Sequence, residues 1–340
     1  MKVGILTGGG DCPGLNAAIR AVVRKGMKDY GMEFVGVRDG WKGMIEAEYF
    51  KIDRNIVSGL LVRGGTMLGS SRTNPMKMDD GIDKVKSGFE KMGLDALIAI
   101  GGDDTLGVAA KMAEAGLKVI GIPKTIDNDL LGTERTIGFN TALTVVVDAI
   151  DRLHTTAESH HRVMILEVMG RHAGWIAVMG GIAGGADLIL IPEKPFKLDD
   201  VCDVIRKRHE TRSFTIVVVA EGAVPEGGSE VLSRGEKDSF GHVALGGIGE
   251  WLRKEIKEKL GFDTRATKLG HVQRGGTPTV ADRLLATRFG VKACELAGKS
   301  EFGVMVALKG DEIVPVPLSE AVKDRVVDDE WYGLAETFFG

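Results

Sequence analysis

Several carboxylates directly follow two short apolar runs, 95–100 and 118–122, in the first half of the chain. The first run is followed by GGDDT and the second by PKTIDND, which together contribute Asp103, Asp104, Lys124, Thr125, Asp127 and Asp129. Carboxylates this close repel one another unless a cation lies among them. The pattern predicts a site for a divalent metal ion and an anionic substrate. The alternative is a pair of polar turns that only cap helices.

The two apolar runs must position these side chains. Both are rich in Ile, Leu and Val and are bounded by Gly or Pro, which is typical of buried strands in a parallel sheet. Residues 106–115, between them, carry apolar side chains at helical spacing, so the stretch predicts a right-handed strand–helix–strand crossover. Ligands of open α/β sheets bind at the carboxyl ends of the strands, where the acidic residues follow.

Glycine-rich loops predict anion binding elsewhere in the first third. A strand at 2–6 leads through TGGGDCPGLN into a helix at 16–28, and backbone N–H groups at such a junction can bind phosphate. This is no Walker A loop, because GxxxxGK[ST] does not occur, and a simple tight turn remains the alternative. The loop RGGTMLGSSR ends in Arg72, either a phosphate ligand or a surface arginine.

Later strands also end in polar loops. A strand at 163–168 is followed by MGRHAG with Arg171, and one at 215–220 is followed by Glu221. The polar stretch 226–242 has no periodicity and is expected to be a loop. A basic turn at 264–278 contains Arg265, His271 and Arg274 and precedes a helix at 280–297. A strand at 303–308 and a peripheral tail are expected to close the chain.

Composition limits the classes of protein that fit. The length of 340 residues suggests two domains, and 44% hydrophobic with 27% charged residues is ordinary for a globular protein. A net charge of −4 argues against a nucleic-acid surface. No apolar run is long enough to span a membrane, and no signal peptide is evident. Three isolated cysteines favour a reducing compartment, so a cytoplasmic location is expected.

Seven stretches in order and spacing carry a resemblance over nearly the whole chain: LTGGGDCPGLNAAIR, RGGTMLGSSR, GGDDT, PKTIDND, TIGFNTA, EVMGRHAGW and LGHVQRGGTP. Together they resemble the phosphofructokinase family. The resemblance implies two Rossmann-like three-layer α/β domains with mainly parallel sheets and an active site in the cleft. We expect a phosphoryl-donor and metal domain at 1–138 with 274–302, a sugar-phosphate domain at 139–273 with 303–320, and a tail at 321–340.

The implied reaction is phosphoryl transfer to the 1-hydroxyl of fructose 6-phosphate. Asp127 resembles the general base, supported by Thr125 and Asp129, and Arg171 the residue that stabilises developing charge. Asp103 resembles the Mg²⁺ ligand. Gly10 and Arg72 resemble ligands of the transferred phosphoryl group. The implied sugar-phosphate ligands are Met169, Gly170, Glu221, His271 and Arg274. Arg162 and Arg265 resemble arginines donated across a subunit interface, which implies a homodimer or homotetramer.

Two positions predict the phosphoryl donor. Members that use ATP resemble GGDG and PGTIDND, whereas this chain has Asp104 and Lys124 at those places. A carboxylate about 4 Å from a nucleotide α-phosphate would cost about 4 kcal/mol at an effective dielectric constant near 20. Pyrophosphate is therefore the predicted donor, and the reaction is expected to be reversible. The alternatives are an ATP-dependent enzyme, a kinase of the NAD or lipid type and a non-catalytic sugar-phosphate sensor.

The effector site of regulated family members is only partly matched. Its basic residues are represented by Arg20, Arg24, Arg54 and Arg152. His154 and Glu210 stand where further basic residues would be expected. Weak regulation is the resulting expectation.

Overall fold

The chain forms two compact units. The computed structural model describes residues 1–228, 232–237, 243–245, 247–321 and 323–340. The first unit comprises Met1–Ile126, Leu130–Thr141 and Arg274–Asp324. The second comprises Asp127–Asp129, Ala142–Gln273 and Arg325–Gly340.

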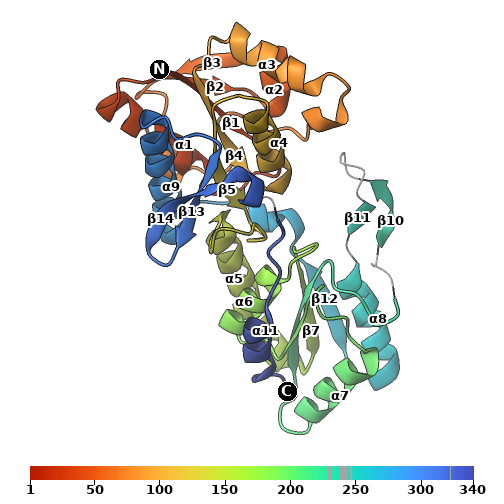
Figure 1. The fold of residues 1–340 in the computed structure, drawn as a ribbon. Helices are drawn as coiled ribbons and strands as arrows, with labels where there is room; N and C mark the ends of the chain where they lie inside the picture. Colours follow the sequence, from red (N-terminus) through yellow and green to blue (C-terminus); the bar gives the residue numbers. More distant parts are fainter. Residues whose placement is uncertain (229–231, 238–242, 246, 322) are drawn as a thin grey trace. The chain divides into compact units, whose positions relative to one another are not determined.

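The first unit is built on an eight-stranded sheet (Figure 1). Its strand order is β14-β13-β5-β4-β1-β2-β3, and β6 pairs with β5 outside this path. The strands are β1 (Lys2–Thr7), β2 (Glu33–Val37), β3 (Tyr49–Ile52), β4 (Ala96–Gly101), β5 (Val119–Thr125), β6 (Ile137–Gly138), β13 (Val304–Lys309) and β14 (Glu312–Pro317). Only β3 and β14 run antiparallel to their neighbours. Gly101 pairs with Pro123, so the acidic residues after β4 and β5 leave the same edge of the sheet.

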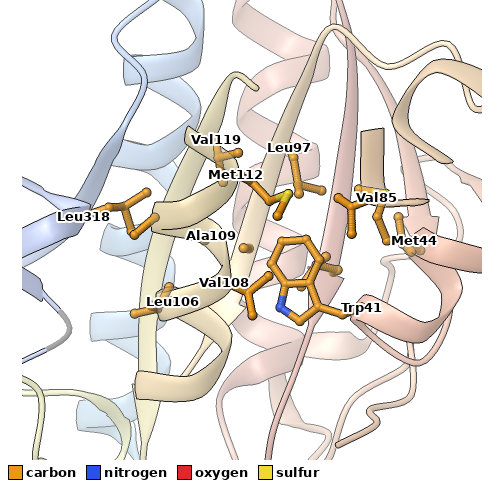
Figure 2. Packing of buried hydrophobic residues seen from close by; sticks show 14 of the residues in the cluster. Trp41, Met44, Val85, Leu97, Leu106, Val108, Ala109, Met112, Val119 and Leu318 are labelled. Atoms are coloured by element: carbon orange, nitrogen blue, oxygen red, sulfur yellow. The ribbon is translucent and has the colours of Figure 1, made fainter. Parts of the chain in front are cut away.

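Helices cover both faces of this sheet. One face packs α2 (Trp41–Glu46), α3 (Gly81–Lys91), α4 (Asp103–Glu114) and α10 (Leu318–Ala321) against the strands. The other carries α1 (Leu15–Asp29) and α9 (Val280–Gly298), which contact each other. Figure 2 shows the first face, where Trp41, Met112 and Val85 lie together over Leu97 of β4. Short 3₁₀ turns η1 (Leu60–Val62) and η2 (Pro75–Lys77) complete the unit.

The second unit has a smaller sheet with four parallel strands. The order is β12 (Thr264–Lys268), β7 (Val163–Val168), β9 (Thr215–Ala220) and β8 (Leu188–Leu190). One face packs against α7 (Leu198–His209) and α8 (Ile248–Leu260). The helices α5 (Phe139–His160), α6 (Trp175–Gly184) and α11 (Asp329–Glu336) and the 3₁₀ turn η3 (Gly270–Arg274) complete the major elements.

The predicted α/β class with mainly parallel sheets is confirmed, but several expected boundaries differ from the structure. Residues 303–320 belong to the first unit, because β13 pairs with β5 and β14 pairs with β13. The turn Asp127–Asp129 belongs to the second unit, although the strand before it belongs to the first. The tail is divided: the Trp331 ring of α11 contacts Trp175 of α6, which places this helix in the second unit.

The expected loop at 226–242 was wrong in part. Residues Leu232–Lys237 form β10, which pairs antiparallel with β11 (Val243–Leu245). The rest of that stretch lies partly outside the described residues. The basic turn at 264–278 likewise begins with strand β12, so Arg265 projects from the sheet instead of from a loop. Its residues lack a period-2 apolar pattern because β12 is a partly exposed edge strand.

Candidate active site

The glycine-rich loop after β1 is held by Lys124. The Lys124 Nζ atom donates to the carbonyl oxygens of Gly8 at 3.0 Å and Gly10 at 2.6 Å. Only 2% of the lysine is exposed, and burial lowers its pKa because removal of water penalises the charged form. The charges of Asp11 and Asp103 act in the opposite direction. Strand β5 therefore places a buried cation against the first glycine-rich loop.

Gly10 lies against the guanidinium of Arg274 in the same unit. A Cβ atom on Gly10 would lie 2.4 Å from Arg274 Nη1, so any side chain there would displace the arginine. The backbone φ of Gly10 is not positive, which means that close approach, and not conformational freedom, requires glycine. The family resemblance implies that Gly10 binds the donor and that Arg274 binds the sugar phosphate. The structure brings the two together.

Asp103 and Asp104 occupy the first turn of α4 and are exposed. The positive end of the helix dipole stabilises carboxylates at this position. Among the residues that the structure describes, no group of three or more His, Cys, Asp or Glu side chains could hold a metal ion. Magnesium sites in phosphoryl-transfer proteins commonly use one or two carboxylates and take their other ligands from phosphates and water. An exposed Asp103 fits that arrangement.

Hydrogen bonds join the two glycine-rich loops of the first unit. The Thr7 hydroxyl donates to Gly69 O at 2.7 Å, and the Ser70 hydroxyl donates to Gly9 O. Asn16, which is 2% exposed, donates to Gly64 O at 3.1 Å and accepts from Met67 N–H at 2.8 Å. Asn16 orients the loop that carries the exposed Arg72, a role that its place in a helical pattern did not reveal.

Thr125 is the last residue of β5 and is held by a second set of hydrogen bonds. Its carbonyl oxygen accepts a hydrogen bond from the Thr136 hydroxyl at 2.6 Å, and Thr125 pairs with Gly138 of β6. Gly138 N–H in turn donates to the buried carboxylate of Asp282 at 3.0 Å. The end of β5 is thus anchored from α9, a helix about 150 positions later in the chain.

In the second unit the acidic turn lies near Glu221. Burial raises the pKa of the Glu221 carboxyl to about 7, and the negative charge of Asp127 raises it further, whereas Lys268 and Arg171 act in the opposite direction. Within the turn, Asn128 is fully buried with a φ of 53°. Asparagine is among the few non-glycine residues that tolerate the left-handed region.

A close backbone approach places Arg171 beside Glu221. Gly222 N–H donates to Gly170 O at 3.1 Å, and a Cβ on Gly222 would lie 2.0 Å from Arg171 O. Gly170 has a φ of 131°, which favours glycine. Gly222 was not predicted to belong to the site. Its position directly after Glu221 was the available signal.

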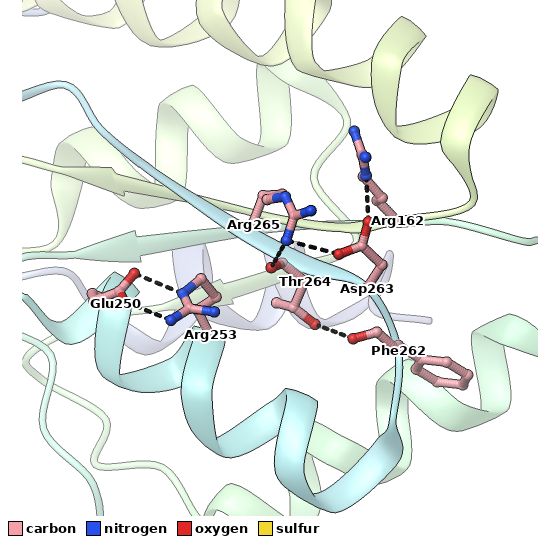
Figure 3. Close-up of polar contacts among 7 residues, drawn as sticks. All are labelled: Arg162, Glu250, Arg253, Phe262, Asp263, Thr264 and Arg265. Atoms are coloured by element: carbon pink, nitrogen blue, oxygen red, sulfur yellow. Dashed lines mark hydrogen bonds and ion pairs between the residues drawn. The ribbon is translucent and has the colours of Figure 1, made fainter.

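Arg162 and Arg265 share the carboxylate of Asp263 (Figure 3). Arg162 Nε lies 2.6 Å from Asp263 Oδ2, and Arg265 Nη1 lies 2.8 Å from Asp263 Oδ1. The Arg162 hydrogen bond is the main cause of a lowered pKa at Asp263. The side chains of the two arginines are 25% and 48% exposed, so one carboxylate holds two cations together near the surface.

The predicted residues therefore fall into groups. The first unit collects Gly10, Lys124 and Arg274, with Asp103 contributing to the same electrostatic environment. The second collects Asp127, Arg171 and Glu221. Met169 and Gly170 precede Arg171 in the same loop, and His271 is exposed on η3. The buried Gly138–Asp282 pair and Asn16 are supporting residues that the sequence did not indicate.

Comparison with known proteins identifies the relatives of this chain. Residues 2–297 match the phosphofructokinase family model. A pyrophosphate–fructose 6-phosphate 1-phosphotransferase of Amycolatopsis mediterranei is 58% identical, with both chains covered over 100% of their length. An ATP-dependent 6-phosphofructokinase of Streptomyces coelicolor is 50% identical, with 99% of each chain covered. The crystal structure of Pichia pastoris phosphofructokinase in the T-state superposes with a TM-score of 0.84 at 34% identity, covering 99% of this chain and 36% of that one.

Two further findings concern the metal requirement of the family and the possibility of a membrane-spanning helix. Enzymes of this family generally need a divalent metal ion. In the part of the chain that the structure describes, none of the helices is long and apolar enough to cross a membrane.

Proposed function

Because this chain belongs to the phosphofructokinase family, we propose that it transfers a phosphoryl group reversibly from pyrophosphate to the 1-hydroxyl of fructose 6-phosphate. The products are fructose 1,6-bisphosphate and orthophosphate. The observation that carries the choice of donor is the buried Lys124 ammonium against the glycine-rich loop, combined with Asp104 in the first turn of α4.

Lys124 can bind a phosphate while it holds the loop. An ammonium has three N–H donors, and two of them are used on Gly8 O and Gly10 O. The third is available for an oxygen of the orthophosphate leaving group, and a bound anion would also offset the burial that lowers the pKa of Lys124. Asp104 acts against nucleotides through like-charge repulsion at the α-phosphate. Gly10 and Arg72 bind the phosphoryl group that is transferred.

The metal in this proposal is Mg²⁺ at Asp103. Asp103 would hold the ion, which would offset the negative charge of the phosphates. A single exposed carboxylate at a helix N-terminus suits an ion that keeps several water ligands.

The second unit supplies the base and most of the sugar ligands, whereas Thr125 and Arg274 belong to the first unit. Asp127 accepts the proton of the 1-hydroxyl as the new P–O bond forms and the bridging P–O bond of pyrophosphate breaks. Thr125 and Asp129 support Asp127, and Arg171 stabilises the charge that develops on the equatorial oxygens. Residues Met169, Gly170, Glu221, His271 and Arg274 bind the sugar phosphate.

In this proposal Arg162 and Arg265 bind the sugar phosphate in the active site of a neighbouring subunit. Their shared pairing with Asp263 keeps two partly exposed cations close together, which suits a phosphate with two negative charges. The active species is then a homodimer or a homotetramer. We place the enzyme in the cytoplasm, in keeping with its three isolated cysteines.

An assay with purified protein, fructose 6-phosphate and Mg²⁺ compares pyrophosphate with ATP as donor. We expect turnover with pyrophosphate and little or none with ATP. The second candidate, an ATP-dependent enzyme, is motivated by the relative of that name at 50% identity, and turnover with ATP alone would establish it. Activity with neither donor would favour a sugar-phosphate sensor, which binding of fructose 6-phosphate without turnover would identify.

A further inference from the structure

The C-terminal segment 325–327, here called the strap, passes directly beside the acidic turn of the second unit. Arg325 N–H donates to Asp129 O at 2.7 Å, and Arg325 Nη1 donates to Asn128 O at 3.4 Å. The turn and the strap are separated by almost 200 positions in the sequence. Neither contact is part of a helix or a strand.

The Arg325 side chain is itself fixed by Trp175. The guanidinium lies over the indole ring with 4.1 Å between Cζ and the ring centroid, and the indole N–H donates to Arg325 O at 3.0 Å. Trp175 is 1% exposed and begins α6. A buried aromatic ring thus holds both the backbone and the guanidinium of Arg325.

The strap also reaches the loop that carries Arg171. Val327 N–H donates to Glu193 Oε1 at 2.8 Å. The same carboxylate accepts from Gly174 N–H at 3.0 and 3.1 Å, at the last residue before α6. Glu193 therefore connects the strap to the end of the MGRHAG loop.

The turn needs such support. Asn128 is buried with a positive φ, a conformation that persists where surrounding contacts determine it. Its neighbours Asp127 and Asp129 carry negative charge, and Arg325 brings a positive charge to the backbone between them. A displacement of the base by about 1 Å can lower a rate roughly 100-fold.

From these contacts we infer that the strap is a positioning device for catalysis, with Arg325 as the positioning residue for Asp127 and Asp129. Arg325 does not touch the substrate in this role. It holds the 127–129 turn in the geometry in which Asp127 meets the 1-hydroxyl, and Val327 extends the same restraint to the Arg171 loop through Glu193. The inference rests on the proposed function, since it takes Asp127 as the base.

The test compares Arg325→Met with Arg212→Met, a matched change at an exposed arginine of the same unit. Methionine keeps much of the length of the side chain but loses the guanidinium. We expect kcat to fall roughly 10- to 100-fold in Arg325→Met, with the KM for fructose 6-phosphate within about twofold of the parent. Arg325→Lys, which keeps the cation, is expected to restore part of the rate. Arg212→Met should match the parent.

A double-mutant cycle separates positioning from a loss of folded protein. In an Asp127→Asn background, the base is already absent, so Arg325→Met should lower kcat less than about twofold further. Equal fold losses in both backgrounds, or a lower melting temperature with unchanged kcat in Arg325→Met, would overturn the inference.

Hydrogen exchange gives a readout that does not depend on activity. Peptides that cover 126–131 should exchange faster in Arg325→Met than in the parent, while peptides from β9 should be unchanged. If the parent has no phosphotransferase activity, the proposed function fails, yet faster exchange would still show that the strap holds the turn. Unchanged exchange in an active enzyme would contradict the inference about the strap but not the proposed function.

Discussion

The side chain of Lys124 has a structural role beside the chemical one that the sequence predicts. Its ammonium satisfies two carbonyl oxygens of the first glycine-rich loop, so its removal would leave these acceptors without their charged donor. In the proposed function, donor choice and loop geometry are therefore linked at this residue. Asp104 is exposed, and the two positions can be tested separately.

The first residue-scale prediction concerns Asp104. Asp104→Gly should raise kcat/KM for ATP by up to roughly a thousandfold, because it removes the repulsion at the α-phosphate. Activity with pyrophosphate should be largely retained. Adding Lys124→Gly should open the site further to ATP but lower activity with pyrophosphate, since the loop loses its support. Steady-state kinetics with both donors provide the measurement, and an unchanged donor ratio in both variants would refute the electrostatic argument.

Removal of the base should affect turnover more than binding. Asp127→Ser is expected to lower kcat by roughly 10²- to 10⁴-fold while the affinity for fructose 6-phosphate stays within a few-fold. Asp151→Ser, at an exposed position of α5, serves as the control. Calorimetric titration and initial rates measure the two quantities. A near-normal rate in Asp127→Ser would remove this residue as the base.

Glu221 should make sugar binding depend on pH. Its pKa of about 7 means that the carboxyl changes from mainly neutral to mainly ionised between pH 6 and 8. In the proposed site the ionised form accepts hydrogen bonds from sugar hydroxyls, so the KM for fructose 6-phosphate should fall by up to about tenfold over this range. Glu221→Gln keeps any titration of the substrate and should have a flatter profile. Identical profiles would exclude Glu221 as the titrating group.

The same carboxyl predicts the direction of a stability change. The pKa of Glu221 is higher in the folded chain than the ordinary value of 4.5, so the carboxyl stays protonated to a higher pH in the folded state than in the unfolded state. Its contribution to stability is fully present below about pH 4.5 and is lost as pH rises to about 7. The melting temperature of the parent relative to Glu221→Gln should therefore fall across that window.

At the scale of elements, the start of α5 depends on a carboxylate from α9. Asp282, which is 1% exposed, accepts hydrogen bonds from Gly138 N–H and from the backbone and hydroxyl of Thr141 at 3.0, 2.7 and 2.6 Å. Two helices and strand β6 meet at this one side chain. Burial raises its pKa, and the hydrogen bonds from Thr141, Gly138 and Asn140 oppose that effect.

Asp282→Asn should destabilise the first unit by about 2 kcal/mol, because an amide cannot accept all of these bonds and presents N–H groups to a donor. Asp311→Asn, in the exposed turn between β13 and β14, is the matched control. Urea denaturation measures the difference. A change equal to that of the control would mean that the Asp282 carboxylate contributes no net stability.

At the scale of the whole molecule, an experiment can test whether the arginine pair on Asp263 contributes to the active site of a neighbouring subunit. One variant lacks the pair (Arg162→Ala with Arg265→Ala), and the other lacks the base (Asp127→Ser). Each alone should be nearly inactive. Equal co-expression should form hybrids in which one site has both its own base and its neighbour's arginines. Random pairing into dimers predicts roughly a quarter of the parent activity.

No recovery of activity in hybrids whose formation is verified with two affinity tags would place the arginines in the site of their own chain. An active monomer, detected by activity that is independent of dilution below the association range, would lead to the same conclusion.

Local patterns in the sequence were sufficient to predict many of the strands, loops and helices of this protein. The apolar runs at 95–100 and 118–122 became β4 and β5, and Asp103 and Asp127 follow them as predicted. Strand periodicity, glycine loops and helix spacing are encoded by neighbours in the chain, so they can be read without tertiary contacts. The order of seven motifs determined the family, and the family match over residues 2–297 confirms it.

Long-range contacts could be decided only by the tertiary structure. The predicted division at residue 303 was wrong because β13 pairs with β5, more than 170 positions away in the sequence. The same is true of Lys124 with Gly10, Asp282 with Gly138, and Arg325 with Asn128. Each contact joins segments whose own patterns contain no signal for the partner. Packing of the whole chain brings such segments together, and the supporting residues of the site follow from that packing.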